Sequence, residues 1–364
     1  MGLPVSAGFE TRPKTKECFR YINDSRPTHP GARFLLTAAC VIVIVAGLKA
    51  AAEVVRPFIL ATFMGVISLP LLVWLRNRGL PKGLAVGVTL LAVIAVVSGL
   101  VALVGGSLNS FVDEVPKYQE RLGEMIAVGQ QQLEKFGLER IELVDVVDPG
   151  QLVDVVRSTV AGVAGVVSKG LLVLLTLIFI LLEATGFYDK LRLAFGLDLD
   201  TRGLSRALKE IQNYLAIKTA ISLLTGLLIW AWVFLLGIDF PVLWGLLAFL
   251  LNYIPNLGSI IAAVPAVLLA IIQQGPGTGL LTALGFLSVN FVLGNLVEPN
   301  LMGRRLGLSA LVVFVSLVFW GWVWGPVGML LSVPLTMVLK ILLENIEDFR
   351  WLAVLLGPNP TPRS

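Results

Sequence analysis

The chain has 364 residues, of which 56% are hydrophobic and only 14% are charged, and its mean hydropathy is +0.87. Soluble globular proteins carry about 25% charged residues, so the composition excludes a set of ordinary soluble domains and predicts an integral membrane protein. The net charge of +4 fits lysine and arginine retained on the cytoplasmic side of a membrane, and we expect no nucleic-acid partner. One histidine and two cysteines are too few for a clustered zinc or haem site, so we expect no metal and no cofactor.

The N-terminal third predicts a tail followed by three membrane spans. Residues 1–33 contain six basic residues, four prolines and no apolar run, which is typical of a basic cytoplasmic tail and not of a secretory signal. Apolar runs at 34–48, 58–75 and 84–108 predict spans one to three. The first run is short against the ~20 residues that a spanning helix needs, whereas the third has no charge.

An acidic segment follows at 109–157. It contains ten acidic and five basic residues, a net charge of −5. Apolar residues, among them Leu122, Met125 and Leu133, recur there near the helical period. We interpret the segment as a small extracytoplasmic helical segment that caps the membrane domain, with a dedicated binding domain as the alternative.

Residues 158–343 read as the membrane core. Single spans are expected at 160–182, 214–236 and 280–297, with a polar cytoplasmic loop at 184–213. Two apolar blocks, 240–272 and 306–343, are each too long for one membrane-spanning helix. At a rise of 1.5 Å per residue, each is barely long enough for two. The first is broken at 252–259, and the second by Gly321, Gly325 and Pro326. We predict two broken, re-entrant helical hairpins; a single tilted span in one block is the alternative.

The positive-inside rule orients these elements. It places the basic tail and the loop with Arg76, Arg78 and Lys82 inside, and the acidic segment outside. Two re-entrant hairpins then return the C-terminal tail, 344–364, to the cytoplasm. The predicted class is an all-α, polytopic membrane protein with a cytoplasmic N-terminus, surrounded by a lipid bilayer.

The candidate site lies where the first hairpin breaks. Broken helices expose backbone groups that hydrocarbon cannot satisfy, and transporters use such breaks to build substrate sites. The predicted substrate or ion pathway is made of Lys218, Asn252, Pro255, Asn256, Gly258, Ser259, Asn295, Glu298 and Pro299. Glu298 is the first candidate for a membrane-embedded coupling carboxylate, ahead of Glu183 and Asp239, with an interfacial ion pair as the alternative. Lys218 either snorkels to the interface or pairs with a carboxylate across a wet cavity.

The sequence resembles the autoinducer-2 exporter family of bacterial membrane proteins over roughly 34–350. The resemblance rests on NYIPNLGSIIAAVPAVLLA (252–270), YLAIKTAISLLTG (214–226), NLVEPNLMGRRLGLSALVV (295–313) and GPVGMLLSVPL (325–335). The chain departs from the family pattern at Ala310, where proline is expected, and in its turn with Trp320, Trp322 and Trp324. The resemblance implies a transporter of the bacterial inner membrane that assembles as a homo-oligomer, a pentamer by analogy. It further implies export of a quorum-sensing furanosyl signal, or sodium/proton antiport.

The residues themselves favour secondary transport of a small polar solute or an ion. The chain has no Gly-Lys dipeptide and so no nucleotide-binding loop. The only histidine, His29, lies in the tail, and HExxH and a pair of intramembrane aspartates are absent, so we do not expect an enzyme. A scaffold in cell-envelope assembly is the third alternative.

Overall fold

The computed structural model describes residues 30–135, 170–184, 186, 190, 201–255, 257–302, 307–346 and 349–357. The chain divides into two units, residues 1–50 and 51–364, and the first contains helix α2 (Pro30–Ala50). The described residues form helices and turns, without a strand. By length and composition, four described helical segments could cross a membrane: Ala52–Asn77, Lys82–Ser107, Leu208–Leu235 and Pro276–Met302. The all-α membrane class is therefore confirmed.

In the second unit, α3 (Ala52–Asn77) is followed by one long helix, α4 (Lys82–Lys135). The predicted boundary at residue 108 is not a break, because α4 continues through the first half of the acidic segment. Helix α3 packs against α7 (Gly170–Ala184). Gly65 allows this approach, since a Cβ atom there would lie 3.1 Å from the side chain of Ile180. The start of the predicted fourth span and residues 136–157 lie outside the described residues.

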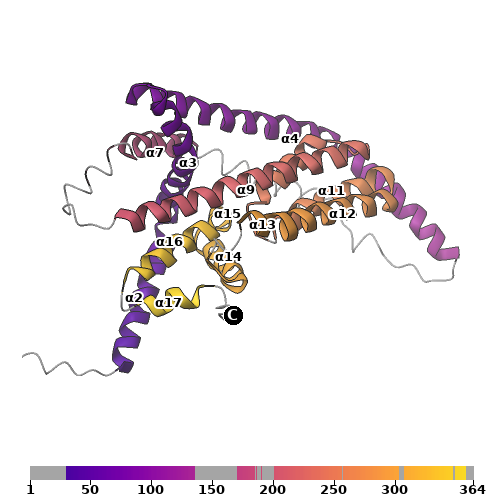
Figure 1. Cartoon of the computed structure of the whole chain (residues 1–364). Helices are drawn as coiled ribbons and strands as arrows, with labels where there is room; N and C mark the ends of the chain where they lie inside the picture. Colours follow the sequence, from indigo (N-terminus) through magenta and orange to yellow (C-terminus); the bar gives the residue numbers. More distant parts are fainter. Residues whose placement is uncertain are drawn as a thin grey trace, which may run out of the picture. The chain divides into compact units, whose positions relative to one another are not determined.

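Helix α9 (Thr201–Leu235) is the central element of the second unit (Figure 1). It begins well before the predicted span start at residue 214, because the preceding polar residues extend the helix instead of ending it. It packs against α10 (Pro241–Leu251) where Gly226 meets Gly245. A Cβ atom on either glycine would lie within 3 Å of the other's carbonyl oxygen, so two small residues set the crossing.

The first predicted hairpin is present. Helix α10 ends at Leu251 and α11 (Gly258–Gln274) begins after a turn, as the proline and glycine there predict. Pro265 lies inside α11 without interrupting it and is buried there. Trp244 and Leu247 of α10 are buried in the largest apolar core, together with Ala262 of α11.

The next span differs from the prediction. Helix α12 (Pro276–Asn290) continues into a π-helix, η1 (Phe291–Val297), and then into α13 (Glu298–Met302). The expected end at 298–300 is wrong, since the helix passes through Pro299. Proline has no N–H to donate to the preceding turn, and a π segment of this kind often lies at a functional site. Figure 1 shows α11 and α12 side by side.

The second block also forms a broken helical hairpin. Helix α14 (Ala310–Trp324) is followed by α15 (Pro326–Leu330), α16 (Ser332–Glu344) and the short α17 (Arg350–Leu355). The main break is at Gly325, whose φ of +66° suits glycine, whereas Gly321 lies within α14. Ala310 occupies the first helical position, where proline is also favoured. Trp320 stacks on Trp324 with ring centroids 4.8 Å apart.

Candidate functional site

One face of α9 carries a strip of polar residues. Tyr214, Lys218 and Ser222 are spaced by four residues, and Thr219 follows Lys218, so these side chains share one side of the helix. Tyr214, Lys218 and Ser222 are buried. A polar strip inside an apolar span must find partners within the protein, because hydrocarbon offers none.

Lys218 forms an ion pair with Glu298, the first residue of α13. The lysine Nζ donates to Oε1 at 2.9 Å and to Oε2 at 3.0 Å. The Lys218 side chain is only 5% exposed and that of Glu298 is 20% exposed. Of the two interpretations of Lys218, pairing with a carboxylate agrees with this geometry and snorkelling does not. Because Glu298 supplies the opposite charge inside the protein, the ammonium group does not have to reach the membrane surface.

The turn between α10 and α11 makes two hydrogen bonds to the same face of α9. Asn252 Nδ2 donates to Ser222 Oγ at 3.0 Å, and the Tyr253 hydroxyl donates to Thr219 Oγ1 at 2.7 Å. Thr219 in turn donates to the carbonyl oxygen of Leu215 at 2.7 Å. Since Thr219 and Ser222 lie within about one helical turn of Lys218, the hairpin turn and the ion pair meet on one stretch of α9.

Gly258 closes this turn. A Cβ atom at Gly258 would lie 1.7 Å from the carbonyl oxygen of Leu251, so the backbones approach so closely here that only glycine fits. The carbonyl oxygen of Pro255 accepts a bond from the Leu257 N–H at 2.7 Å. Ser259 is the second residue of α11, and Asn256 lies outside the described residues.

Two other predicted residues lie apart from this cluster. Asn295 in η1 and Pro299 in α13 are both exposed on the surface of the chain. Their neighbour Glu298 faces inward, and its backbone N–H donates to the carbonyl oxygen of Leu293, five residues earlier. The sequence thus pointed to the right segment, but only Glu298 within it reaches the polar strip.

The other two candidate carboxylates have different surroundings. Glu183 pairs with Lys190 at 2.6 Å, and both side chains are more than half exposed. Asp239 accepts a hydrogen bond from the Tyr118 hydroxyl at 2.8 Å and another from the Gln273 amide. Of the three, Glu298 is the one paired with a buried lysine.

Sequence reasoning missed Thr219, Ser222 and Tyr253. The four-residue spacing of Tyr214, Lys218 and Ser222 was the available signal for the α9 face. Nothing local indicated that Tyr253 would bond to α9, because that depends on the direction in which the turn points.

The site therefore combines hydroxyl and amide groups with one buried pair of opposite charges. Hydroxyls and amides both donate and accept hydrogen bonds, so they suit a small polar solute. Within the described part of the chain, His, Cys, Asp and Glu side chains form no group of three that could hold a metal ion.

Comparison with known proteins gives one consistent result. Residues 38–348 match the model of the AI-2E family transporter. The chain is 37% identical to YhhT of Escherichia coli K12, named as a presumed transport protein, over 92% of this chain and 96% of that protein. It is also 37% identical to the AI-2 transport protein TqsA of the same organism, over 90% and 96%. A presumed transport protein of Haemophilus influenzae is 39% identical over 89% and 96%.

A family match across most of the chain and relatives at this identity agree with the helical membrane architecture. They also agree with the expectation that the chain is not an enzyme, because the family and these relatives are described as transport proteins. The chain belongs to the AI-2E family of transporters and is a polytopic membrane transporter.

Proposed function

We propose that the protein exports a small polar solute, of the autoinducer-2 type, across the bacterial inner membrane by secondary transport. One observation carries the proposal: the turn of the first hairpin and the Lys218–Glu298 ion pair meet on one face of α9. The similarity to TqsA, named as an AI-2 transport protein, supports this class of solute.

The recognition step follows from the hydrogen bonds of the hairpin turn. Asn252 and Tyr253 each bond to a hydroxyl of α9. A solute rich in hydroxyl groups offers the same donors and acceptors, so it replaces these bonds with bonds of similar strength. Exchange of that kind lets the turn separate from α9 without leaving buried polar groups unpaired, and this separation would open the pathway.

The ion pair supplies the coupling. Two buried opposite charges are stable only while they face each other, because either one alone is costly in a medium of low polarity. Protonation of Glu298, or binding of a cation to it, would release Lys218 and weaken the contact between α13 and α9. An ion gradient would thereby bias the separation of the hairpin turn from α9.

Cation/proton antiport is the second candidate function. The same observation favours it, since an intramembrane carboxylate next to a lysine resembles an ion site in which the ammonium group holds the position of the cation. In this reading the hairpin turn supplies further oxygen ligands, and no organic solute is needed.

Flux through the purified full chain in liposomes tests both candidates. Liposomes that contain the protein and are loaded with autoinducer-2 should release it faster than liposomes without protein. Asn252→Ala should lower the rate of release strongly. Pro265→Ala, inside the uninterrupted helix α11, should retain most of the rate. If the solute does not move but a sodium gradient drives proton flux, the antiport candidate holds. If neither moves, both candidates fail and a scaffold role takes their place.

We also infer that the chain assembles as a homo-oligomer. Asn295 is exposed on a helix long and apolar enough to cross the membrane. An amide facing lipid is unfavourable, whereas amides between helices bind to each other. Asn295→Leu should therefore shift the mass of the detergent-solubilised particle towards the monomer; a monomeric wild-type protein would contradict the inference.

A further inference from the structure

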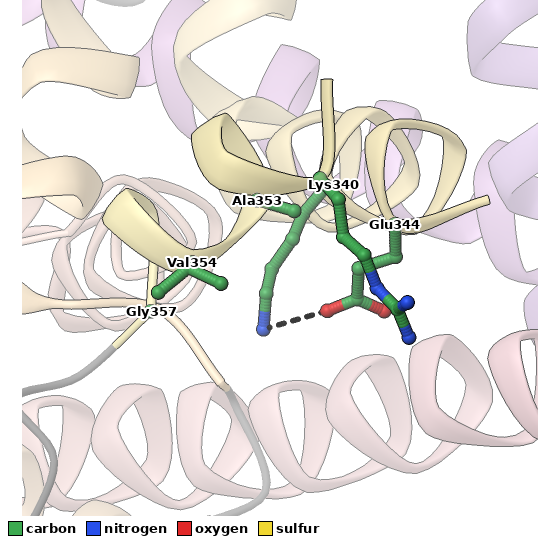
Figure 2. Close-up of a pocket in the computed structure, with 6 residues that line it drawn as sticks. Lys340, Glu344, Ala353, Val354 and Gly357 are labelled. Carbon is green, nitrogen blue, oxygen red and sulfur yellow. Dashed lines mark ion pairs between the residues drawn. The ribbon is translucent and has the colours of Figure 1, made fainter. Parts of the chain in front are cut away.

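A cavity of about 370 Å³ lies between α16 and α17, away from the hairpin turn. It is lined by Lys340, Glu344, Arg350, Ala353, Val354 and Gly357, as Figure 2 shows. Its volume falls within the ~300–1,000 Å³ of typical small-molecule pockets. Its lining combines two cationic side chains, one carboxylate and an apolar wall.

Lys340 is held in place at this cavity. Its Nζ donates to the carbonyl oxygen of Gly307 at 2.8 Å and lies 3.4 Å from Glu344 Oε1; the second contact is the dashed line in Figure 2. The lysine side chain is 19% exposed. An ammonium group has three N–H donors; among the described residues these partners account for two, and the third can donate to a ligand.

Arg350, the first residue of α17, adds a second cation and is exposed. A guanidinium group has a planar fork of donors that matches the oxygens of a phosphate. The Glu344 side chain is 50% exposed, so water screens its charge more than it screens Lys340. The cavity is therefore suited to an anion. The Glu344 carboxylate is suited to a hydroxyl or ammonium group next to that anion in the same ligand.

The outer surface of α17 is apolar. Trp351, Val354 and Leu355 are 59%, 73% and 66% exposed, whereas Ala353 on the same short helix is buried. Tryptophan next to arginine is typical of the level where lipid head groups meet the acyl chains. Val354 belongs both to this surface and to the wall of the cavity, so the cationic cavity adjoins a surface suited to lipid.

We propose that this cavity binds the phosphate of a membrane phospholipid. Lys340 and Arg350 donate to the phosphate oxygens, Glu344 accepts from the polar head group, and the exposed side chains of α17 contact the first methylenes of the acyl chains. The bound lipid joins α16 to α17 and stabilises the C-terminal end of the second hairpin.

Native mass spectrometry of the delipidated full chain tests the proposal. Titration with phosphatidylglycerol should give one tight adduct, and Arg350→Gln should weaken it about tenfold, because charge-assisted hydrogen bonds are lost. Lys117→Gln is the matched control: it removes the same charge from an exposed ion pair in α4 and should leave the adduct unchanged. Arg350→Lys should retain most of the binding. Equal binding by wild type and Arg350→Gln, or equal losses in Arg350→Gln and Lys117→Gln, would overturn the proposal.

Two further measurements separate the alternatives. The melting temperature of lipid-free Arg350→Gln should equal that of the wild type, so that weaker binding is not a folding defect; a large fall would assign Arg350 a structural role and overturn its assignment as a ligand. Inorganic phosphate at millimolar concentration should not displace the lipid. Displacement would show that the cavity takes free phosphate and that the lipid assignment is wrong.

Discussion

The backbone at Gly258 approaches the carbonyl oxygen of Leu251 so closely that a Cβ atom on residue 258 would lie 1.7 Å from it. The second hairpin repeats this relationship, since a Cβ atom at Gly328 would lie 1.9 Å from the carbonyl oxygen of Trp320. In both hairpins a glycine lets the returning helix pack against the backbone of the helix before it. The two breaks thus share one physical device although their sequences differ.

Gly258→Ala should destabilise the protein by about 1–3 kcal/mol, because the added methyl group meets backbone that cannot move without reshaping the turn. Thermal unfolding in detergent measures the loss. Gly277→Ala is the matched control, since its Cβ atom would meet nothing within 4 Å, and helical alanine is slightly more stable than glycine. Equal melting temperatures for the two variants would contradict this account of the turn.

Lys218→Ala and Glu298→Ala should each lower the free energy of unfolding by about 3–5 kcal/mol, because each leaves an unpaired buried charge. The double variant Lys218→Met/Glu298→Leu should recover most of that stability, since it removes both charges, yet it should not transport. Lys117→Ala, which breaks an exposed pair with Glu114, should cost only about 0–1 kcal/mol. A double variant with wild-type flux would show that the pair is only structural.

Tyr253→Phe removes the hydroxyl that bonds to Thr219. We expect a loss of about 0.5–1.5 kcal/mol in stability and a much larger relative loss of solute flux, because the hydroxyl also binds the solute. Asn290→Ala provides the control, as its amide bonds within its own helix, to the carbonyl oxygen of Phe286. If flux falls equally in both variants, Tyr253 has no special part in recognition.

Tyr118 lies on α4 beyond the apolar segment Lys82–Ser107. Burial, and then its hydrogen bond to Asp239, raise the pKa of Tyr118 above its ordinary value of 10.0. The folded protein therefore keeps the phenol proton at a pH where the unfolded chain has lost it. The stability that the protonated phenol contributes should be constant below pH about 10, and should fall by up to about 1.4 kcal/mol per pH unit above it.

Melting temperatures of the wild type and Tyr118→Phe, measured from about pH 8 to 11, test this linkage. The variant should be less stable at neutral pH, because it lacks the bond to Asp239, but less sensitive to alkali. The difference between the two curves isolates Tyr118 from the other tyrosines. Parallel curves would mean that the phenol titrates normally.

The charge distribution predicts which side of the membrane each end of the spans faces. In a background without Cys18 and Cys40, a cysteine at Glu120 of the acidic segment should react with an impermeant thiol reagent added to intact cells. A cysteine at Lys190, in the polar loop 184–213 that is predicted to be cytoplasmic, should react only after the cells are opened. Labelling of both from outside would reverse the predicted orientation.

The sequence predicted the breaks in the two hairpins well because proline and glycine act locally. Helix ends were predicted less well: the polar residues after Thr201 were read as loop, although polarity alone does not stop a helix. The same reasoning placed a boundary in the middle of α4. Charge and apolarity indicate where a helix leaves the membrane, not where it ends.

The site was predicted only in part for a similar reason. Lys218, Asn252 and Glu298 could each be selected from their own segments, but the lysine and glutamate are 80 residues apart in the chain. Their pairing depends on how three helices pack, and so does the choice of Tyr253. The sequence could not decide whether Lys218 snorkels or pairs with a carboxylate, because the carboxylate that pairs with it comes from α13.

The π-helix η1 explains how one continuous helix packs against α11 and also brings Glu298 to α9. Phe286 and Leu293 are buried on one side of it, and an α-helix continued from there would turn Val297 inward. Instead the wide turn brings Glu298 inward, five residues after Leu293, and Met302 is buried four residues later. Without this wide turn, an α-helix through the same residues would rotate the carboxylate by about 100° and leave it facing away from Lys218. Loss of one residue between Leu293 and Glu298 would instead restore the α repeat with the carboxylate four residues after Leu293, still facing inward. The way this segment winds therefore decides whether Lys218 has a counter-ion.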